Sequence, residues 1–257
     1  MSYIRYHFPK EISAFSTCRD GGVGSGTYAT FNCTHYCGDN EADVLVNRSR
    51  LCTDWHIAPD RIFIPRQVHG TLVAEISEEF LALPVEQQQV RLDGVDALIT
   101  RMPHCCIAVS TADCIPILLY DAHARAIAAV HAGWRGTVAR ILTLTLREMS
   151  VRYGVRAENL VAVIGPGISL DAFEVGDEVF HAFHEAGFPM ERIACRKKKW
   201  HIDLWEANRL QLLEAGVSES RIEVAGICTY DRYERFFSAR RLGINSGRIL
   251  TGIMRTE

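Results

Sequence analysis

The stretch VDALITRMPHCCIAVSTADCIPILLYDAHARAIAAVHA, residues 95–132, decides the fold of this chain. It consists of short apolar runs separated by turn-forming residues: VDALIT at 95–100, CCIAVST at 105–111, IPILLYD at 115–121 and RAIAAVHA at 125–132. Apolar runs of this length, rich in β-branched residues, are typical of strands that are covered on both faces. The centre of the chain is therefore predicted to be a buried β-sheet.

Weaker patterns on both sides of this stretch predict more strands and several helices. Strands are expected at 4–8, 12–17, 61–65, 71–76, 160–165, 221–227 and 247–254, and helices at 40–56, 136–152, 175–187 and 203–217. Asp39 or Asn40 can cap the first helix, whereas residues 77–92 are polar and indicate a surface excursion. Because strands and helices alternate only loosely, we expect an α/β or α+β sandwich with mixed sheets, in one domain spanning 1–257.

The composition is that of an ordinary globular protein. The 257 residues carry a formal net charge of −3, and 48% of them are hydrophobic. A nucleic-acid-binding protein normally shows a basic excess, and no apolar run reaches the roughly 20 residues that span a bilayer. The N-terminal residues lack the features of a signal peptide, and the nine cysteines form no Cys-x-x-Cys pair. We therefore expect a cytoplasmic protein that binds neither nucleic acid nor membrane.

Three short segments each place a candidate metal ligand beside a tight turn. They are QVHG at 67–70, TADC at 111–114 and VHAGWRG at 130–136, and their candidate ligands are His69, Cys114 and His131. Two imidazoles and one thiolate form a set that in zinc enzymes leaves a fourth position for water or substrate. Scattered histidines and cysteines are more often packed or surface residues, however, and spacing alone leaves the choice open.

The segment HAGWRG is unusual because two glycines surround a Trp-Arg pair just after a predicted strand. Such a turn lets the backbone approach a ligand closely, and the N-terminus of a following helix favours an anion. Arg135 adds a bidentate donor that suits phosphate or carboxylate. The alternative is a tight turn between strand and helix with Trp134 in the core.

The motifs together resemble those of a known family. The chain is similar, in order and spacing, to the YfiH-like family in QVHG, DALIT, TADCIPILLYD, AAVHAGWRGT, IGPGISLDAFEVGDEV and FFSARR, with FNCTHYCGDN and VNR upstream. That family carries the label multicopper polyphenol oxidase (laccase) domain and is similar to zinc-dependent purine nucleoside phosphorylases. The resemblance extends from about Phe15 to Arg255. FNCTHYCGDN departs from the more usual LNLG-type stretch.

The resemblance implies both a fold and a site. The implied fold is a four-layer α/β/β/α sandwich with mixed β-sheets. His69, Cys114 and His131 match the family's zinc ligands. Arg48 matches a basic residue associated with the active site, where a guanidinium would suit phosphate or ribose oxygens.

Three further residues have two interpretations each. Asp113, beside Cys114, could orient a ligand or accept a proton in catalysis, but an aspartate between two strands is more often a turn residue. Arg240 and Arg241 belong to a family motif that is compatible both with binding a ligand and with bracing the fold.

The activity implied by the resemblance is that of a zinc-dependent purine nucleoside phosphorylase. Its substrates would be phosphate with inosine, adenosine, guanosine or 5′-methylthioadenosine, and the same site would deaminate adenosine. Because one chain carries all three metal ligands, a monomer is expected.

Other functional classes are compatible with the same residues. Two histidines and one cysteine are also the trigonal set of a blue-copper site, which a copper-dependent polyphenol oxidase (laccase) would need. A multicopper oxidase needs many more ligands, typically in His-x-His pairs, and none of the 10 histidines has that spacing. A metal-free cysteine hydrolase or amidase would use Cys114 as nucleophile and His131 as base. A binding module would hold a nucleoside without turning it over.

Overall fold

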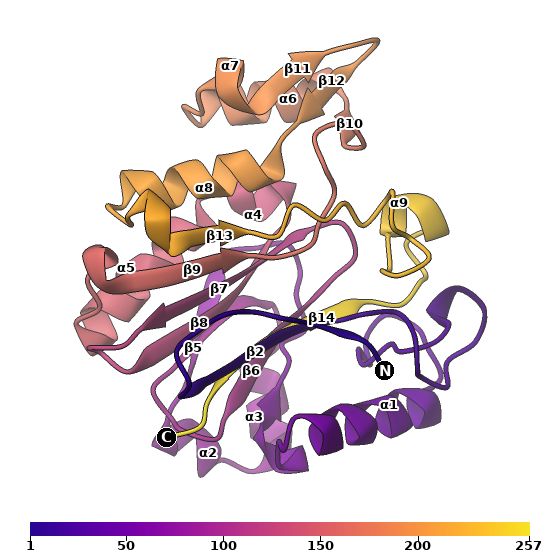
Figure 1. Ribbon diagram of the computed structural model, residues 1–257, viewed down its shortest axis with the longest axis vertical. Helices are drawn as coiled ribbons and strands as arrows, with labels where there is room; N and C mark the ends of the chain where they lie inside the picture. The colour runs from indigo at the N-terminus through magenta and orange to yellow at the C-terminus, as the bar shows by residue number, and fades with distance from the viewer.

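Two β-sheets lie face to face at the centre of the molecule in the computed structural model, which describes residues 1–257 (Figure 1). The six-stranded sheet has the order β13–β9–β7–β8–β5–β4, with β4 at Leu72–Ile76, β5 at Val95–Thr100, β7 at Ile115–Asp121, β8 at Ala126–Ala132, β9 at Leu160–Ile164 and β13 at Ile222–Val224. The five-stranded sheet has the order β1–β2–β14–β6–β3, with β1 at Tyr3–Arg5, β2 at Ile12–Thr17, β3 at Ile62–Phe63, β6 at Cys106–Thr111 and β14 at Ile249–Arg255. Each sheet combines parallel and antiparallel pairs, as the sequence predicts.

Buried apolar side chains fill the space between the two sheets. Ile107 and Val109 of β6 pack there against Leu98, Leu118 and Ile127 of the six-stranded sheet. All five are fully buried, and burying an aliphatic side chain of this size stabilises the fold by about 1.5–3 kcal/mol. The alternation along each strand sends the neighbouring residues to the outer faces, so those faces also need a cover.

Helices cover the outer face of each sheet. Helices α5 (Ile141–Tyr153) and α8 (Leu204–Glu214) pack on the six-stranded sheet, and α1 (Glu41–Asp54) packs on the five-stranded sheet. Figure 1 shows α5 and α8 on one side of the sheets and α1 on the other. The four-layer α/β/β/α order and its mixed sheets are thus confirmed.

Helix α1 follows from its sequence. The Asn40 side chain accepts hydrogen bonds from the backbone N–H groups of Ala42 and Asp43, which satisfies two amides that have no partner inside the helix. Val44 and Leu51 are buried on the face that meets the sheet. The predicted helix is confirmed, and of its two possible caps, Asp39 and Asn40, the structure uses Asn40.

Residues 77–92 differ from the predicted surface excursion, because they form the helices α2 (Glu78–Leu81) and α3 (Val85–Arg91). The Ser77 side chain caps α2 by accepting a hydrogen bond from the Phe80 backbone N–H. The buried Phe80 ring packs edge-on against Phe63 of β3, with ring centroids 5.6 Å apart. This contact joins segments far apart in the sequence, so a local pattern does not show it.

The single helix expected at 136–152 is instead two helices, α4 (Trp134–Val138) and α5. Arg140, between them, has a φ of +62°, and a residue in the left-handed region cannot continue a right-handed helix. Its side chain is held by the Ala186 carbonyl, by Glu214 and by the face of the Phe188 ring. The break therefore depends on tertiary contacts.

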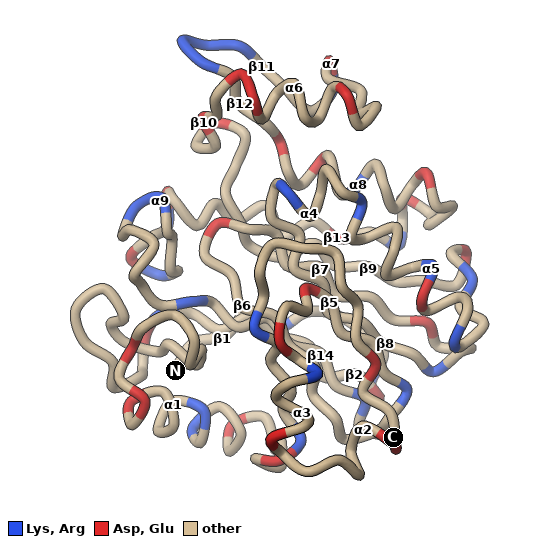
Figure 2. The backbone as a smooth tube through the Cα atoms, turned by 180° about the vertical axis from the view of Figure 1, so that it is seen from behind, with Lys and Arg blue, Asp and Glu red and all other residues tan.

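A small lobe built from residues 174–202 stands at the top of Figure 1. It contains the antiparallel strands β10 (Glu174–Val175), β12 (Trp200–Ile202) and β11 (Ala194–Arg196), with α6 (Asp177–Glu185) and α7 (Met190–Ile193). Figure 2 shows the basic tip of this lobe between β11 and β12. Lys197 and Lys199 form exposed ion pairs there with Asp171 and Glu174. The remaining helix, α9, spans Ala239–Leu242, and none of the helices has the length and apolar character that crossing a membrane requires.

The packing of α1 on the five-stranded sheet is tested by a pair of leucines on that helix. We expect Leu51→Ala to lower the free energy of unfolding by about 2–5 kcal/mol, because Leu51 is fully buried. Leu45 is 59% exposed on the same helix, so Leu45→Ala should change the free energy of unfolding by about 0.5 kcal/mol at most. Urea denaturation measures both values, and equal losses would contradict this arrangement.

Candidate metal centre

The C-terminal end of β8 brings distant segments together through its pairing with two neighbours. Its register with β7 pairs Pro116 with His131, and its register with β5 pairs Ala97 with Val130. One step further along the β5 register, Asp96 stands opposite His131. Two steps further along the β7 register, Cys114 stands opposite Gly133. Strand pairing therefore accounts for the position of two of the candidate ligands.

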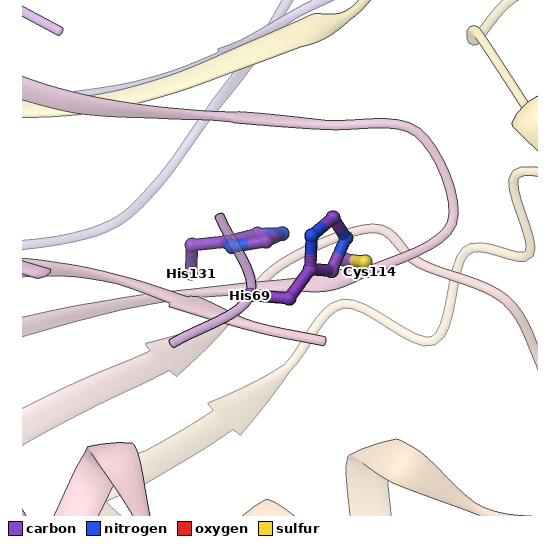
Figure 3. A group of neighbouring side chains, drawn as sticks. All are labelled: His69, Cys114 and His131. Carbon is purple, nitrogen blue, oxygen red and sulfur yellow. The ribbon is translucent and has the colours of Figure 1, made fainter. Parts of the chain in front are cut away.

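His69, Cys114 and His131 form one cluster, in which the ligand atoms all lie within 4.8 Å of one another. Figure 3 shows the three side chains gathered at this point. The His69 and His131 rings meet edge to face, with centroids 4.8 Å apart. His131 is buried, Cys114 is half-buried and His69 is exposed, so the cluster opens toward solvent on one side. The predicted convergence of these three residues is therefore seen in the structure.

Asp96 contacts two of the three ligand residues. Its carboxylate is fully buried, and Oδ1 accepts hydrogen bonds from the His131 ring at Nδ1 (2.7 Å) and from the His69 backbone N–H (3.0 Å). Oδ2 accepts from the backbone N–H groups of Gly70 (2.7 Å) and Val68 (3.3 Å). Burial alone would raise the pKa of Asp96, but the hydrogen bonds from His131 and these amides hold it below its usual value.

Sequence reasoning did not identify Asp96 as a site residue. DALIT contributes to the family resemblance, but the resemblance implies no role for the aspartate within it. The available signal is chemical: Asp96 is the one charged residue in the apolar strand VDALIT, and a buried carboxylate requires partners.

The lack of a side chain at Gly133 leaves room for the cluster. A Cβ at this position would lie 2.8 Å from His69 Cδ2 and 3.0 Å from Cys114 Sγ, closer than ordinary contact permits. The glycine predicted to allow a close backbone approach thus stands directly against two of the ligands.

The electrostatics of the cluster favour a thiolate at Cys114 beside a protonated ring at His131, which must give up one proton when a metal binds. Burial would raise the pKa of Cys114, but the His131 and His69 imidazoles lower it to about 6. Burial would lower the pKa of His131, but Cys114 and Asp96 raise it to about 9. The thiolate is the form of cysteine that binds metals. Two imidazoles and a thiolate around an open side fit a tetrahedral zinc site, and the same donors fit a trigonal copper site.

Asp113 holds the turn that carries Cys114. It has a φ of +86°, and its carboxylate accepts hydrogen bonds from Thr229 Oγ1 and from the Arg240 backbone N–H, both at 2.7 Å. The Asp113 carbonyl also accepts a bond from the Ile168 N–H (2.9 Å). These contacts agree with the interpretation of Asp113 as a turn residue, and a role in proton transfer stays a prediction.

Arg240 and Arg241 make bracing contacts. Arg240 donates from its side chain to the Glu174 carbonyl (3.0 Å). The Arg241 guanidinium lies over the rings of Tyr230 and Tyr233, at 5.0 and 4.7 Å from their centroids. Both arginines thus connect loops around the turn of Cys114.

Arg48 and Arg135 lie outside the cluster. Arg48, half-buried on α1, lines a cavity of about 440 Å³ together with His35, Arg61, Phe63 and Leu83, and none of the three ligand residues lines this cavity. Arg135 is exposed, with its guanidinium 4.3 Å from the centroid of the Trp134 ring. Helix α4 begins at Trp134, inside HAGWRG, and has only five residues, so the motif does not open the single long helix that the sequence predicts.

Comparisons with known proteins cover almost the whole chain. The model of the family described as multi-copper polyphenol oxidoreductase laccase matches residues 13–256. A purine nucleoside phosphorylase of Bacteroides thetaiotaomicron is 52% identical over 95% of this chain and 91% of its own length. Adenosine deaminase RL5, from an unknown prokaryotic organism, is 45% identical over 95% and 94%. The crystal structure of YlmD from Geobacillus stearothermophilus is 30% identical, with a TM-score of 0.93 over 100% of this chain and 97% of that one.

The space at Gly133 generates a direct test of the cluster. We expect Gly133→Ala to weaken binding of a divalent cation by about 10–100-fold, the range seen when the support of a ligand is lost, because the methyl group displaces His69 and Cys114. Gly252→Ala is the control, since this glycine of β14 is similarly crowded but its Cβ would meet Phe15, Ala108 and Cys106 rather than the cluster. Titration with Co²⁺ measures the affinity, and circular dichroism checks the fold. Equal affinity in both variants would contradict the proposed position of the metal.

Proposed function

Because the chain belongs to the multi-copper polyphenol oxidoreductase laccase family, whose curated relatives here are named as a purine nucleoside phosphorylase and an adenosine deaminase, we propose that it is a zinc-dependent purine nucleoside phosphorylase. It would cleave inosine, adenosine, guanosine and 5′-methylthioadenosine with phosphate, and deaminate adenosine in the same site. The observation that carries this proposal is the cluster of His69, Cys114 and His131, open on one side.

Phosphorolysis exchanges one bond of the sugar for another. The bond between C1′ and the base nitrogen breaks, the base leaves with the electron pair and takes up a proton, and a phosphate oxygen bonds to C1′ to give ribose 1-phosphate. Positive charge develops on the sugar and negative charge on the base, so fixed positive groups near the base or the phosphate stabilise the transition state. When bound, a zinc ion supplies such a charge as a Lewis acid.

The chain's own residues would hold the reacting groups. His69, Cys114 and His131 would bind the metal, and Asp113 would keep the Cys114 turn in place and is also our candidate for accepting a proton. Arg48 is assigned to phosphate or the ribose oxygens. It forms no ion pair with a carboxylate and lines a cavity with a second arginine, Arg61. A guanidinium free of a carboxylate partner is suited to an anionic or hydroxyl-rich ligand.

Arg135 is our second candidate for substrate binding. It is exposed on α4, three residues after the end of β8, where the cluster lies. Its contact with the Trp134 ring keeps the planar guanidinium oriented, and such a group can bind a phosphate through two parallel hydrogen bonds.

Copper-dependent oxidation of polyphenols is the second candidate, because the family description and the donor set both fit it. A multicopper oxidase needs several copper sites, whereas the structure gathers one group of three potential ligands. Metal analysis of protein prepared without added copper separates the candidates: one zinc per chain supports the phosphorylase, and copper supports the oxidase.

Cys114→Ser tests whether metal and activity depend on the same residue. A hydroxyl is a far poorer zinc ligand than a thiolate. We therefore expect loss of zinc, of phosphate-dependent hypoxanthine release from inosine and of adenosine deamination together. Cys195→Ser is the control, since Cys195 is half-buried in β11, away from the cluster.

Elemental analysis and product chromatography measure the two properties. A Cys114→Ser protein that has lost its zinc yet splits inosine at the parent rate would contradict the proposal. A variant that keeps its metal but loses turnover would instead support the cysteine hydrolase.

Arg48→Ala tests the second part of the proposed site. We expect the fold and zinc content to stay unchanged and phosphorolysis to fall by roughly 10²–10³-fold, the usual effect of removing a group that stabilises transition-state charge. Arg50→Ala is the control, because Arg50 lies on the same helix and donates to the Gly21 carbonyl. The rate of phosphorolysis is measured at saturating and at limiting phosphate. Unchanged rates under both conditions would show that Arg48 has no part in the reaction.

A further inference from the structure

We propose that Asp96 is the positioning residue of the metal centre, which fixes the tautomer of His131 and the backbone turn that carries His69. The inference rests on the proposed function in one respect, namely that the cluster binds a metal. It concerns a residue that does not itself belong to the ligand set, and it follows from four hydrogen bonds to one fully buried carboxylate.

The contact with His131 determines which ring nitrogen is available. An ionised carboxylate only accepts hydrogen bonds, so the 2.7 Å contact with Asp96 requires the proton on Nδ1 of His131. In the neutral ring, the lone pair is then on Nε2, and this is the form in which an imidazole binds a metal after any proton on Nε2 has left. Without Asp96, both tautomers and other ring orientations would become accessible.

The contacts with the backbone determine where His69 points. His69 has a φ of +62°, a conformation uncommon for residues other than glycine. Its side chain is exposed, so packing does not hold the ring. The backbone N–H groups of Val68, His69 and Gly70 all donate to Asp96, which anchors the turn on both sides of the ligand.

The position of Asp96 makes both roles possible at once. It is the residue opposite His131 when the β5–β8 register is extended by one step beyond Ala97 and Val130. The loop with His69 packs against this point, since its amides donate to Asp96 and a Cβ on Gly70 would lie 3.3 Å from Asp96 Oδ2. One carboxylate therefore joins a strand ligand to a loop ligand.

The chain also contains a matched control for this inference. Asp121 is fully buried at the end of β7, and it accepts hydrogen bonds from the backbone N–H groups of His123, Ala124 and Arg156. None of its partners is a metal ligand. Asp121 thus resembles Asp96 in burial and in backbone hydrogen bonding, but not in its contact with the metal centre.

The experiment compares Asp96→Asn with Asp121→Asn in the full-length protein loaded with Co²⁺. We expect Asp96→Asn to weaken Co²⁺ and Zn²⁺ binding by about 10–100-fold, measured against a competing chelator, and to shift the d–d bands and the thiolate-to-cobalt absorption. Asp121→Asn should leave affinity and spectrum at parent values even if it lowers the melting temperature. Parent affinity and spectrum in Asp96→Asn, or equal losses in both variants, would overturn the inference.

A second measurement uses the parent protein, so it does not depend on whether a variant folds. Long-range ¹H–¹⁵N spectra of the zinc-loaded protein report the state of each histidine ring. We expect one buried histidine with a proton on Nδ1 and the metal on Nε2, and the reverse assignment for His131 would overturn the inference. Both readouts are independent of turnover. If the metal site depends on Asp96 but the protein does not split inosine, the proposed function is contradicted and the inference about Asp96 still holds.

Discussion

The pairing of β8 with both of its neighbours is the constraint on which the site depends. The register with β5 brings Asp96 to His131, and the register with β7 brings Cys114 to Gly133. Because side chains alternate between the faces of a strand, a shift of either register by one residue would turn these groups to the wrong face. The buried apolar residues between the sheets, such as Leu98 and Ile127, resist such a shift. The packing that stabilises the core therefore also keeps the site residues in position.

The site combines residues on buried strands with ligands on irregular segments. His131 and Asp96 belong to buried strands, whereas His69 lies on an exposed loop and Cys114 on a turn. Hydrogen bonds from that loop to Asp96 tie it to β5, and hydrogen bonds from Thr229 and Arg240 to Asp113 tie the Cys114 turn to the segments around it. Metal ligands held in this way need little rearrangement on binding, which favours affinity.

Much of this arrangement could be predicted from sequence, and the remainder depends on long-range contacts. The bounds of β2, β5 and β7 match the apolar runs, and Asn40 caps α1 as its side chain allows. The three ligands came from the family motifs, since their spacing alone left alternatives open. The break at Arg140, the small helix held by Phe80 and the role of Asp96 all need partners distant in sequence. Local patterns carry no information about those partners.

The central claim is that one metal ion binds between His69, Cys114 and His131 of this chain. X-ray data collected at the zinc absorption edge from zinc-loaded crystals test it most directly. We expect a single strong anomalous peak per chain, about 2.0–2.1 Å from one nitrogen of each imidazole and about 2.3 Å from the Cys114 sulfur. No peak at this position in zinc-loaded protein, or a peak held by other side chains, would contradict it.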